Sequence, residues 1–402
     1  MSLISLDEAR RLLLRDLPAL GSERVALDQA LGRTLAEAVV ASHTQPAEPR
    51  ATMDGIAVPD SNPAPGTEWR LAGDAPAGAG APAPLRPGEA IRVATGAVVP
   101  EGAARVLPQE LLQYSGDRAT LVSQPSSARF IRQAGADFAA GDRLLERGVR
   151  IGPAELGLIA AANCSSAEVV REPKVTICTA GDELVTPGST LREGQSVDSA
   201  SHTLAALVRR WGGVPRVCPI LPDDLEAITS ALRDTVETCD ILLCIGGASV
   251  GRRDLVRPAA RSLGGQFLFE GIAVQPGKPC WHARADPGTL ILGLPGNPSS
   301  AFVCAHLLLL PLTDALLNRA SADNLRQAYS ATVLPANGER EQYLRASASY
   351  DAGGQLWAEP LSDQDSGLQS NLAKARLLIR RPAGAKALNQ GACVEVLELA
   401  VV

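Results

Sequence analysis

The amino-acid sequence predicts a multi-domain α/β protein, with a parallel-sheet α/β domain, an N-terminal elongated helical domain, a small β domain, and a C-terminal β barrel or sandwich. The chain has 402 residues, which is too long for one compact core and suggests about three or four structural units. Strand-like and helix-like segments alternate from Lys174 to about Leu317, as is typical of βαβ units around a parallel sheet. Short β-rich runs separated by glycine and proline lie on both sides of this stretch.

The first forty residues are predicted to be mainly helical. Ser5 and Glu8 form a capping box that begins an amphipathic helix extending through about Leu17. Ser22 is a candidate cap for a second helix, which would extend toward Val40. The N-terminal region is therefore expected to be an elongated helical domain.

Two stretches of short alternating apolar runs are predicted to form β domains, at residues 42–140 and 319–402. Within the first, the Pro- and Gly-rich residues 75–90 have the composition of a flexible linker, although a loop of the β domain also accounts for them. Residues 141–172 then return to a helical and apolar pattern.

Three segments of the α/β stretch place a buried strand directly before a Gly-rich turn. The strand at residues 289–292 leads into a turn rich in glycine and proline, after which Ser299 is predicted to cap a helix. Residues 240–251 and 174–188 repeat this arrangement. Each turn alone is also consistent with an ordinary strand-to-helix connection. Because the carboxyl ends of parallel strands meet at one edge of a sheet, the three turns together predict a single anion-binding crevice.

Composition and charge argue against nucleic-acid and membrane partners. The formal net charge of −6 lacks the basic footprint of a nucleic-acid-binding protein. The cysteines form no C-x-x-C pairs near histidine, and Cys178, Cys244 and Cys304 lie in apolar runs, which fits buried thiols in a reducing, cytoplasmic setting. No apolar run approaches the roughly 20 residues that span a bilayer, and Pro311 interrupts the longest candidate, Leu307 to Leu310. The histidines suggest no metal cluster.

Seven motifs occur together, in an order and at separations found in one protein family. Four lie in the α/β stretch: TAGDELVTPG, GGASVGRRD, QPGKP and GLPGNPSSA. Three lie upstream: TMDGIAV, ATGAVVPEGA and RQAGADFAAGDRLL. On these motifs the chain resembles the MoeA family of molybdopterin molybdenumtransferases, which is related to the E domain of gephyrin. The resemblance covers essentially the whole chain.

The resemblance implies a domain division and an activity. The implied domains are a discontinuous elongated domain, an inserted β domain, an α/β molybdopterin-binding domain and a C-terminal β domain, at residues 1–41 plus 141–172, 42–140, 173–318 and 319–402. The implied reaction inserts molybdenum from molybdate into adenylylated molybdopterin and releases AMP, with Mg²⁺ as cofactor. The family also implies a homodimer, in which the α/β domain of one subunit faces the inserted β domain of the other.

Candidate site residues fall on the motif positions. The predicted catalytic carboxylates are Asp54, Asp137, Glu183, Asp223 and Asp254, of which Asp223 and Asp254 are the predicted Mg²⁺ ligands. The predicted substrate-binding residues are Thr95, Gly246, Gly247, Ser249, Lys278, Pro295, Pro298, Ser300, Arg345 and Ser366. Each carboxylate alone is also consistent with a cap or turn residue, and Asp223 in particular lies where an N-cap is expected.

Several positions depart from the family pattern. The common N-S-A-M-D-G-Y-A run is RATMDGIA here, at residues 50–57, while S-G-G begins with Ile245 and D-S-N ends with Ala200. The first lysine of K-P-G-K-P is Gln275, and a lysine often found four positions earlier is Gly271. Loss of two cations predicts weaker molybdate or phosphate binding, by roughly 1.5 to 3 kcal/mol for each charge-assisted hydrogen bond.

These departures leave two further hypotheses open. A degenerate MoeA-like paralogue would bind molybdopterin or act as a scaffold without turnover, and a related nucleotide or pterin hydrolase would act without molybdate. Arg252 and Arg253, beside a Gly-rich turn, are candidates for replacement charge at the oxyanion site. Release of AMP that depends on molybdate separates a transferase from both alternatives.

Overall fold

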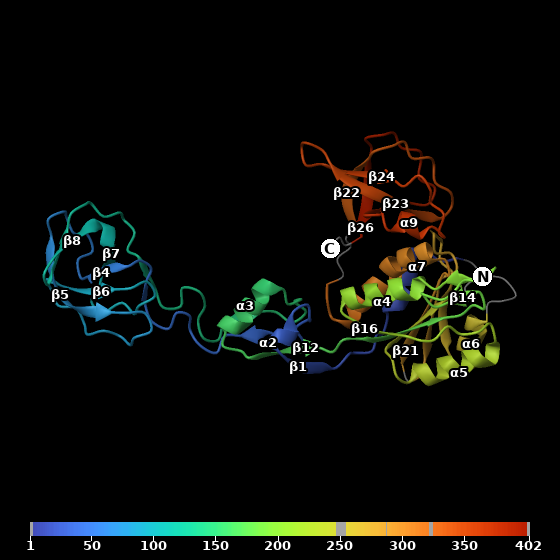
Figure 1. Ribbon diagram of the computed structural model, residues 1–402, viewed down its shortest axis with the longest axis horizontal. Helices are drawn as coiled ribbons and strands as arrows, with labels where there is room; N and C mark the ends of the chain where they lie inside the picture. The colour runs from blue at the N-terminus through green and yellow to red at the C-terminus, as the bar shows by residue number, and fades with distance from the viewer. Residues whose placement is uncertain (1–2, 247–254, 287, 321–324, 400–402) are drawn as a thin grey trace.

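The computed structural model describes residues 3–246, 255–286, 288–320 and 325–399. The protein is elongated (Figure 1), with a β region at one end, a narrow middle region, and an α/β region carrying a C-terminal barrel at the other end. The chain passes from the α/β region out to the β region and back again, so segments from the two passes lie side by side in the middle region.

The first helix, α1 (Leu6–Leu14), begins as predicted, because the Ser5 hydroxyl accepts a hydrogen bond from the Glu8 N–H at 3.1 Å. It ends at its C-cap, Arg15, and does not extend to Leu17. Its apolar side packs against the α/β region, on strand β18 (Gln266–Glu270) and helix α8 (Leu310–Leu316). The N-terminal helix therefore contributes to the core of the α/β region.

The helical prediction for the remaining N-terminal residues is wrong. Ser22 begins strand β1 (Ser22–Ala26), only the single turn α2 (Leu27–Ala30) is helical, and β2 (Val39–Val40) follows. β1 pairs antiparallel with β12 (Ser166–Val170) on the returning pass of the chain. Since a partner so distant in sequence decides this structure, the local pattern favoured the wrong element.

The prediction for residues 141–172 also needs correction, because only α3 (Pro153–Ala161) is helical there. Strand β11 (Arg143–Leu145) precedes it and pairs with β2, and β12 follows it. The buried residues of this middle region come from both passes of the chain and are Val25, Ala30, Leu35, Ile151, Ile159, Ala167 and Val169. The middle region thus has its own small core.

The β region is a six-stranded sheet of order β7-β4-β6-β5-β9-β8, with the short pair β3–β10 beside it. The strands are β3 (Arg50–Ala51), β4 (Gly55–Val58), β5 (Glu68–Ala75), β6 (Glu89–Val93), β7 (Arg105–Pro108), β8 (Leu112–Ser115), β9 (Arg118–Leu121) and β10 (Ile131–Arg132), with a 3₁₀ turn at Gln109–Leu111. Residues 76–88 connect β5 to its parallel neighbour β6, so the Pro- and Gly-rich stretch is a loop of this sheet.

The α/β region contains a six-stranded sheet of order β16-β13-β17-β21-β20-β18. Strands β13 (Lys174–Thr179), β16 (Val214–Val217), β17 (Ile241–Ile245) and β21 (Thr289–Leu294) are parallel. β20 (Trp281–Ala285) runs antiparallel to β21, and the edge strand β18 (Gln266–Glu270) runs antiparallel to β20. Smaller strands are β14 (Leu184–Val185), β15 (Ser196–Val197) and β19 (Val274–Gln275). The alternating pattern in the sequence correctly predicted this parallel sheet.

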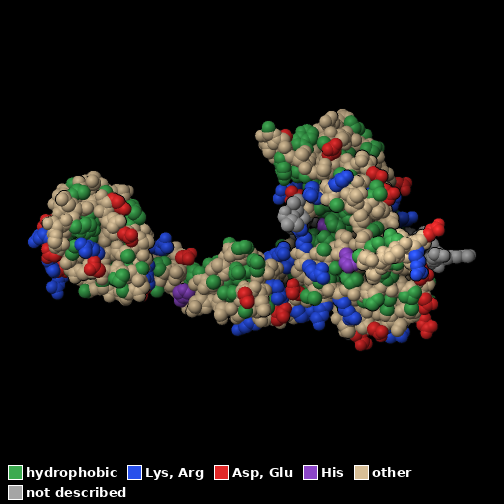
Figure 2. All heavy atoms as spheres, in the orientation of Figure 1, with side chains coloured by type: hydrophobic (Ala, Val, Ile, Leu, Met, Phe, Trp, Pro, Cys, Tyr) green, Lys and Arg blue, Asp and Glu red, His purple; other side chains and the backbone are tan. Residues whose placement is uncertain are grey.

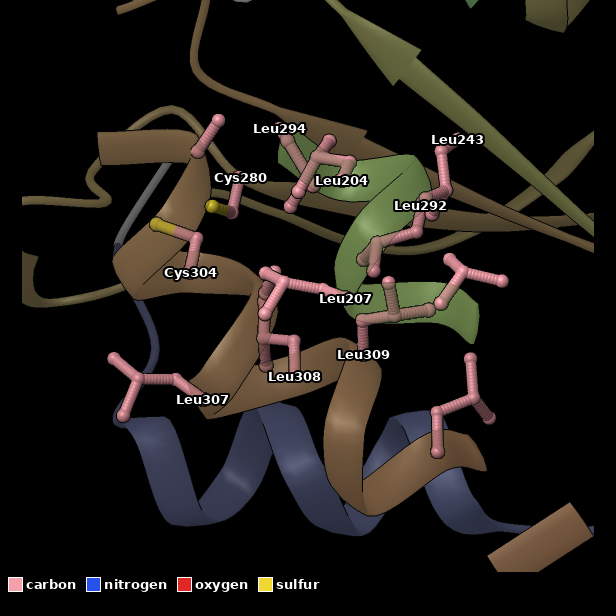
Figure 3. Close-up of a cluster of buried hydrophobic side chains, with 14 of the residues drawn as sticks. Leu204, Leu207, Leu243, Cys280, Leu292, Leu294, Cys304, Leu307, Leu308 and Leu309 are labelled. Atoms are coloured by element: carbon pink, nitrogen blue, oxygen red, sulfur yellow. The ribbon is translucent and has the colours of Figure 1, made fainter. Parts of the chain in front are cut away.

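Helices cover both faces of that sheet. They are α4 (Ala200–Trp211), α5 (Leu225–Val236), α6 (Val256–Ser262), α7 (Pro298–Cys304), η2 (Ala305–Leu309) and α8 (Leu310–Leu316). One buried cluster joins α1, α4 and α7–α8 to one face of the sheet and is drawn in part in Figure 3. A second cluster joins α5 and α6 to the other face. Burial on both faces explains why the parallel strands are continuous apolar runs.

The helix from α7 to α8 does not end at Pro311. It runs from Pro298 to Leu316, and the π-helical stretch η2 lies just before Pro311. A π-helical turn accommodates a residue that lacks an N–H and crowds the preceding turn. By length and composition this helix is apolar enough to cross a membrane, with mean hydropathy 1.5, but 78% of it is buried inside the protein, as in a core helix.

The C-terminal residues form a closed barrel. Its strands are β22 (Leu325–Ser330), β23 (Glu341–Tyr350), β24 (Leu356–Pro360), β25 (Leu377–Arg381) and β26 (Cys393–Glu398), with the helical turn α9 (Gln369–Leu372) between β24 and β25. The order β23-β24-β22-β26-β25 closes because β25 also pairs with β23. Of the two predicted architectures, the barrel is therefore correct.

Candidate functional site

Four parallel strands end at one edge of the α/β sheet, and the residues that follow them meet there. We call this the carboxyl edge and define it as residues 180–183, 221–223, 246 and 295–297. A Cβ placed on Gly296 would lie 3.3 Å from the Cα of Gly246, and one placed on Gly246 would lie 2.9 Å from the carbonyl oxygen of Ala180. Gly246 also has a φ of +83°. The positive φ and the contact with Ala180 require glycine at 246, and the space beside Gly296 is tight, as at a site where backbone approaches a ligand.

Two carboxylates at the carboxyl edge are linked through the backbone. The N–H of Asp223 donates to Oδ1 of Asp182 at 3.0 Å. Helix α5 is capped by Asp224, whose side chain accepts from the Ala227 N–H at 2.8 Å. Asp223 is therefore not the cap, and its carboxylate remains outside the helix. Asp182 was absent from the predicted catalytic set, although its place after β13 beside Glu183 was a usable signal.

Lys278 lies in the loop that joins β19 to β20. Because β20 runs antiparallel to β21, its first residue, Trp281, stands opposite Gly293 near the end of β21. Two residues separate Lys278 from the start of β20, so the topology places it beside the carboxyl edge, and it is exposed. Its carbonyl accepts from the Ile272 N–H at 3.1 Å, which holds the loop. A basic side chain thus lies next to the Gly-rich turns.

The turn before α7 is bonded to the barrel. The Asn297 side chain donates to Oγ of Ser366 at 2.7 Å, and the Ser299 N–H donates to the Ser366 carbonyl at 3.2 Å. Asn297 is the N-cap residue, so the prediction that Ser299 caps this helix is wrong; Ser299 lies within α7 and is buried. Ser300 is buried beside it. With Pro298 lacking an N–H, fewer backbone donors remain for an anion here than the sequence suggested.

Arg345 supports the loop that contains Ser366 and is itself buried. Its guanidinium donates to the Asp365 carbonyl at 2.9 Å, and its backbone N–H donates to Gln364 Oε1 at 2.9 Å. Burial lowers the pKa of Arg345. Because the Arg345 side chain donates to backbone and amide acceptors of residues 364 and 365, it holds in place the loop that contains Ser366.

The predicted residues of the β region lie far from the carboxyl edge. Oδ1 of Asp54 accepts hydrogen bonds from the Thr95 N–H at 2.6 Å and from the Thr95 hydroxyl at 2.9 Å, and both lower the pKa of Asp54. Asp137 is exposed and donates its backbone N–H to the Gln45 carbonyl. In one chain these residues and the carboxyl edge lie at opposite ends, separated by the narrow middle region (Figures 1 and 2).

Five predicted residues, namely Gly247, Ser249, Arg252, Arg253 and Asp254, lie outside the described residues. Within the described residues, no group of three or more His, Cys, Asp or Glu side chains is arranged to hold a metal ion.

Two departures from the motif pattern have structural reasons. Gly271 has a φ of +130°, which strains any residue with a Cβ, and a Cβ there would lie 2.8 Å from the end of the Leu3 side chain, which would have to move. Gln275 accepts a hydrogen bond from Arg340 at 3.2 Å, which brings a cation to its side chain. Arg340 had no signal in the sequence, because it belongs to a distant segment.

Comparison with known proteins gives a consistent result along the chain. Three family models match: the MoeA N-terminal region (domain I and II) at residues 4–163, a probable molybdopterin binding domain at 176–315, and the MoeA C-terminal region (domain IV) at 327–399. The molybdopterin molybdenumtransferase of Nostoc sp. is 32% identical over 94% of this chain and 89% of its own length. The enzyme of the same name from Bacillus subtilis is 30% identical over 98% and 94%.

A solved structure agrees over the whole chain. The molybdopterin biosynthesis MoeA protein from Pyrococcus horikoshii is 26% identical, covers 100% of both chains, and superposes with a TM-score of 0.85. The similarity therefore extends to every region of the fold.

Proposed function

Because this chain belongs to the MoeA family of molybdopterin molybdenumtransferases, we propose that it acts in molybdenum cofactor biosynthesis, inserting molybdenum from molybdate into adenylylated molybdopterin with release of AMP. The observation that carries the proposal is the contact between the turns of Gly246 and Gly296, with the loop of Lys278 beside them. Both substrates are anions, and this edge combines close backbone approach with a cation.

The side chains at the carboxyl edge have separate tasks in this proposal. The Gly246 and Gly296 turns let the phosphates of the substrate approach the backbone. Lys278 offsets negative charge on phosphate or molybdate as a point charge. Ser366 and Asn297 join the turn before α7 to the barrel, and Arg345 holds their loop. The barrel thus supports one wall of the site.

Mg²⁺ fits the donors at this edge. Asp182 and Asp223 lie at adjacent strand ends, where their carboxylates would offer oxygen ligands, and Asp223 is not used as a helix cap. Mg²⁺ needs only one or two carboxylates when substrate phosphate and water complete its shell. We propose that Asp223 is one ligand; the motif pattern of the sequence names Asp254, which lies outside the described residues, as the second, and the ion would neutralise phosphate charge when bound. We propose Glu183 as a further catalytic carboxylate at the carboxyl edge.

A homodimer would unite the two distant parts of the predicted site. A second copy would bring Asp54, Thr95 and Asp137 of its β region to the carboxyl edge of the first. The corresponding domains are residues 1–41 plus 141–172, 42–140, 173–318 and 319–402. The eight free cysteines support a cytoplasmic location.

The activity is tested by incubating the protein with adenylylated molybdopterin, molybdate and Mg²⁺ and following AMP. We expect AMP release that requires molybdate. No release would contradict the proposed transferase, and release independent of molybdate would indicate hydrolysis.

The shared site is tested by mixing two impaired variants, Asp54→Asn and Lys278→Met. If each site uses residues from both copies, mixed dimers contain one intact site, and equal mixing should restore about one quarter of wild-type activity. Mixing either variant with itself is the control. Failure to restore activity, with subunit exchange verified by mass spectrometry, would contradict the shared site.

A further inference from the structure

Three cysteines lie side by side across neighbouring strands of the α/β sheet, just before the carboxyl edge. Cys178 in β13 is in register with Cys244 in β17. Cys218 directly follows β16 and continues its pairing with β13, since its N–H donates to the Ile177 carbonyl at 2.9 Å. These side chains share the face covered by α5 and α6. No part of the proposed transferase reaction uses them.

The geometry favours one pair in this row. The thiol of Cys178 donates to Sγ of Cys218, with the sulfur atoms 3.4 Å apart, and both cysteines are reduced. Paired strands lie about 4.8 Å apart, which is within the Cα separation of roughly 4.4–6.8 Å that a disulfide spans. A disulfide can therefore form here by side-chain rotation with little movement of the backbone.

The two thiols have different environments. Cys178 is 3% exposed, whereas Cys218 is only partly buried and so can meet a small oxidant. The hydrogen bond from Cys178 and the nearby charge of Arg216 lower the pKa of Cys218. The same hydrogen bond and burial raise the pKa of Cys178. Cys218 is thus suited to react first, with Cys178 in place to resolve the product.

We propose that Cys218 and Cys178 form a peroxide-sensitive dithiol that closes to a reversible disulfide beside the carboxyl edge. The Cys218 thiolate attacks one oxygen of hydrogen peroxide; the O–O bond breaks, hydroxide leaves, and Cys218 becomes a sulfenic acid. The Cys178 sulfur then attacks the Cys218 sulfur, the S–O bond breaks, and water leaves with the proton of Cys178. Overall, the two thiols lose two electrons, and these electrons reduce one molecule of hydrogen peroxide. This modification is independent of the proposed transferase function.

The location connects the dithiol to the strand ends that carry the carboxylates. Beyond it, the Leu221 N–H donates to the Thr179 carbonyl at 2.9 Å, and the Gly181 N–H donates to the Leu221 carbonyl at 3.1 Å. The next link along the same two segments is the bond between Asp223 and Asp182. A disulfide between Cys178 and Cys218 would therefore cross-link the ends of β13 and β16 just before these hydrogen bonds begin.

The test treats the full-length protein with a stepwise series of hydrogen peroxide, blocks the remaining thiols by alkylation, and maps disulfides by mass spectrometry. The exposed Cys393 is changed to Ser in all samples, because it would react independently. We expect a peptide linked through Cys178 and Cys218 to appear first and to disappear with dithiothreitol. Cys218→Ser and Cys178→Ala should each abolish it.

A second cysteine pair provides a matched control within the same protein. Cys280 and Cys304 lie close together in the buried cluster of Figure 3, and both are fully buried. We expect them to remain alkylatable after unfolding at peroxide concentrations that fully oxidise the proposed pair. If Cys178 instead links to Cys244, or if Cys218 is oxidised to the sulfinic acid while Cys178 stays reduced in the wild-type pair, the proposal is wrong.

Discussion

The carboxyl edge and the Asp54 loop hold their candidate residues in different ways. At the carboxyl edge, four strand ends determine the positions, and the contacts are between backbones, as between Gly246 and Ala180. In the β region, the Asp54 carboxylate is held by the Thr95 N–H and hydroxyl, and both residues lie in exposed loops of that region. The first arrangement depends on the whole sheet, whereas the second is local. Changes to the carboxyl edge should therefore cost more than changes beside Asp54.

The largest effect is expected for Gly246→Ala. An alanine there would adopt an unfavourable positive φ, at about 1–2 kcal/mol, and would press on the Ala180 carbonyl, at about 1–3 kcal/mol more. Urea unfolding should show a loss of about 2–5 kcal/mol, together with loss of AMP release. Gly188→Ala is the control, because Gly188 has a φ of +89° but nothing within 4 Å, so only the backbone cost should appear. Equal losses in both variants would contradict close packing at the edge.

Lys278→Met should leave stability nearly unchanged but weaken the reaction. Loss of a charge-assisted hydrogen bond to an anion costs roughly 1.5–3 kcal/mol, so kcat/KM should fall roughly 10- to 150-fold. Lys174→Met is the matched control, since Lys174 is also exposed but begins β13 at the opposite edge of the sheet. Similar kinetics for the two variants would remove Lys278 from the site.

Sequence patterns predicted some parts of this fold and not others, for physical reasons. The parallel strands were predicted well because burial on both faces makes them apolar throughout, as in β17 and β21. The N-terminal strand β1 was missed because its pairing with β12 is set by a distant segment. The Ser5 cap, in contrast, depends on residues within one helical turn and was predicted correctly.

The same distinction applies to the candidate site. The turns of Gly246 and Gly296 were predicted to meet because strand ends of a parallel sheet share an edge. The pairing of Asp182 with the Asp223 N–H, and the contact of Arg340 with Gln275, involve separate segments and carried no local signal. The assignment of Ser299 as a cap failed because Asn297, two residues earlier, has that position.

Acid should weaken the α/β region before the β region. Burial lowers the pKa of His306 from 6.5 to about 4, so the unfolded chain binds a proton that the folded chain does not. Stability is therefore lost as pH falls from about 6.5 toward 4, and between pH 7 and 5 this histidine should account for about 2 kcal/mol. In urea unfolding at both pH values, His306→Gln should reduce the loss by that amount. The wild-type protein measured in parallel is the reference, and equal pH dependence in the wild type and in His306→Gln would contradict this role.

The smallest effect is expected at Asp54, and it tests whether that loop is as local as its contacts suggest. The Thr95 hydroxyl and N–H favour the ionised carboxylate, so Thr95→Val should raise the pKa of Asp54 toward its usual value, while the remaining N–H keeps part of the shift. The stability that this ionised form adds above the usual pKa is lost as pH falls through the lowered pKa. Carboxyl-carbon NMR titration measures the shift, with Thr95→Ser as the control that retains the hydroxyl. Among the described residues no contact joins Asp54 to the carboxyl edge of its own chain, so Gly246→Ala should leave this pKa unchanged in the monomer. A change that appears only in the dimer would instead support the proposed approach of Asp54 from a second copy.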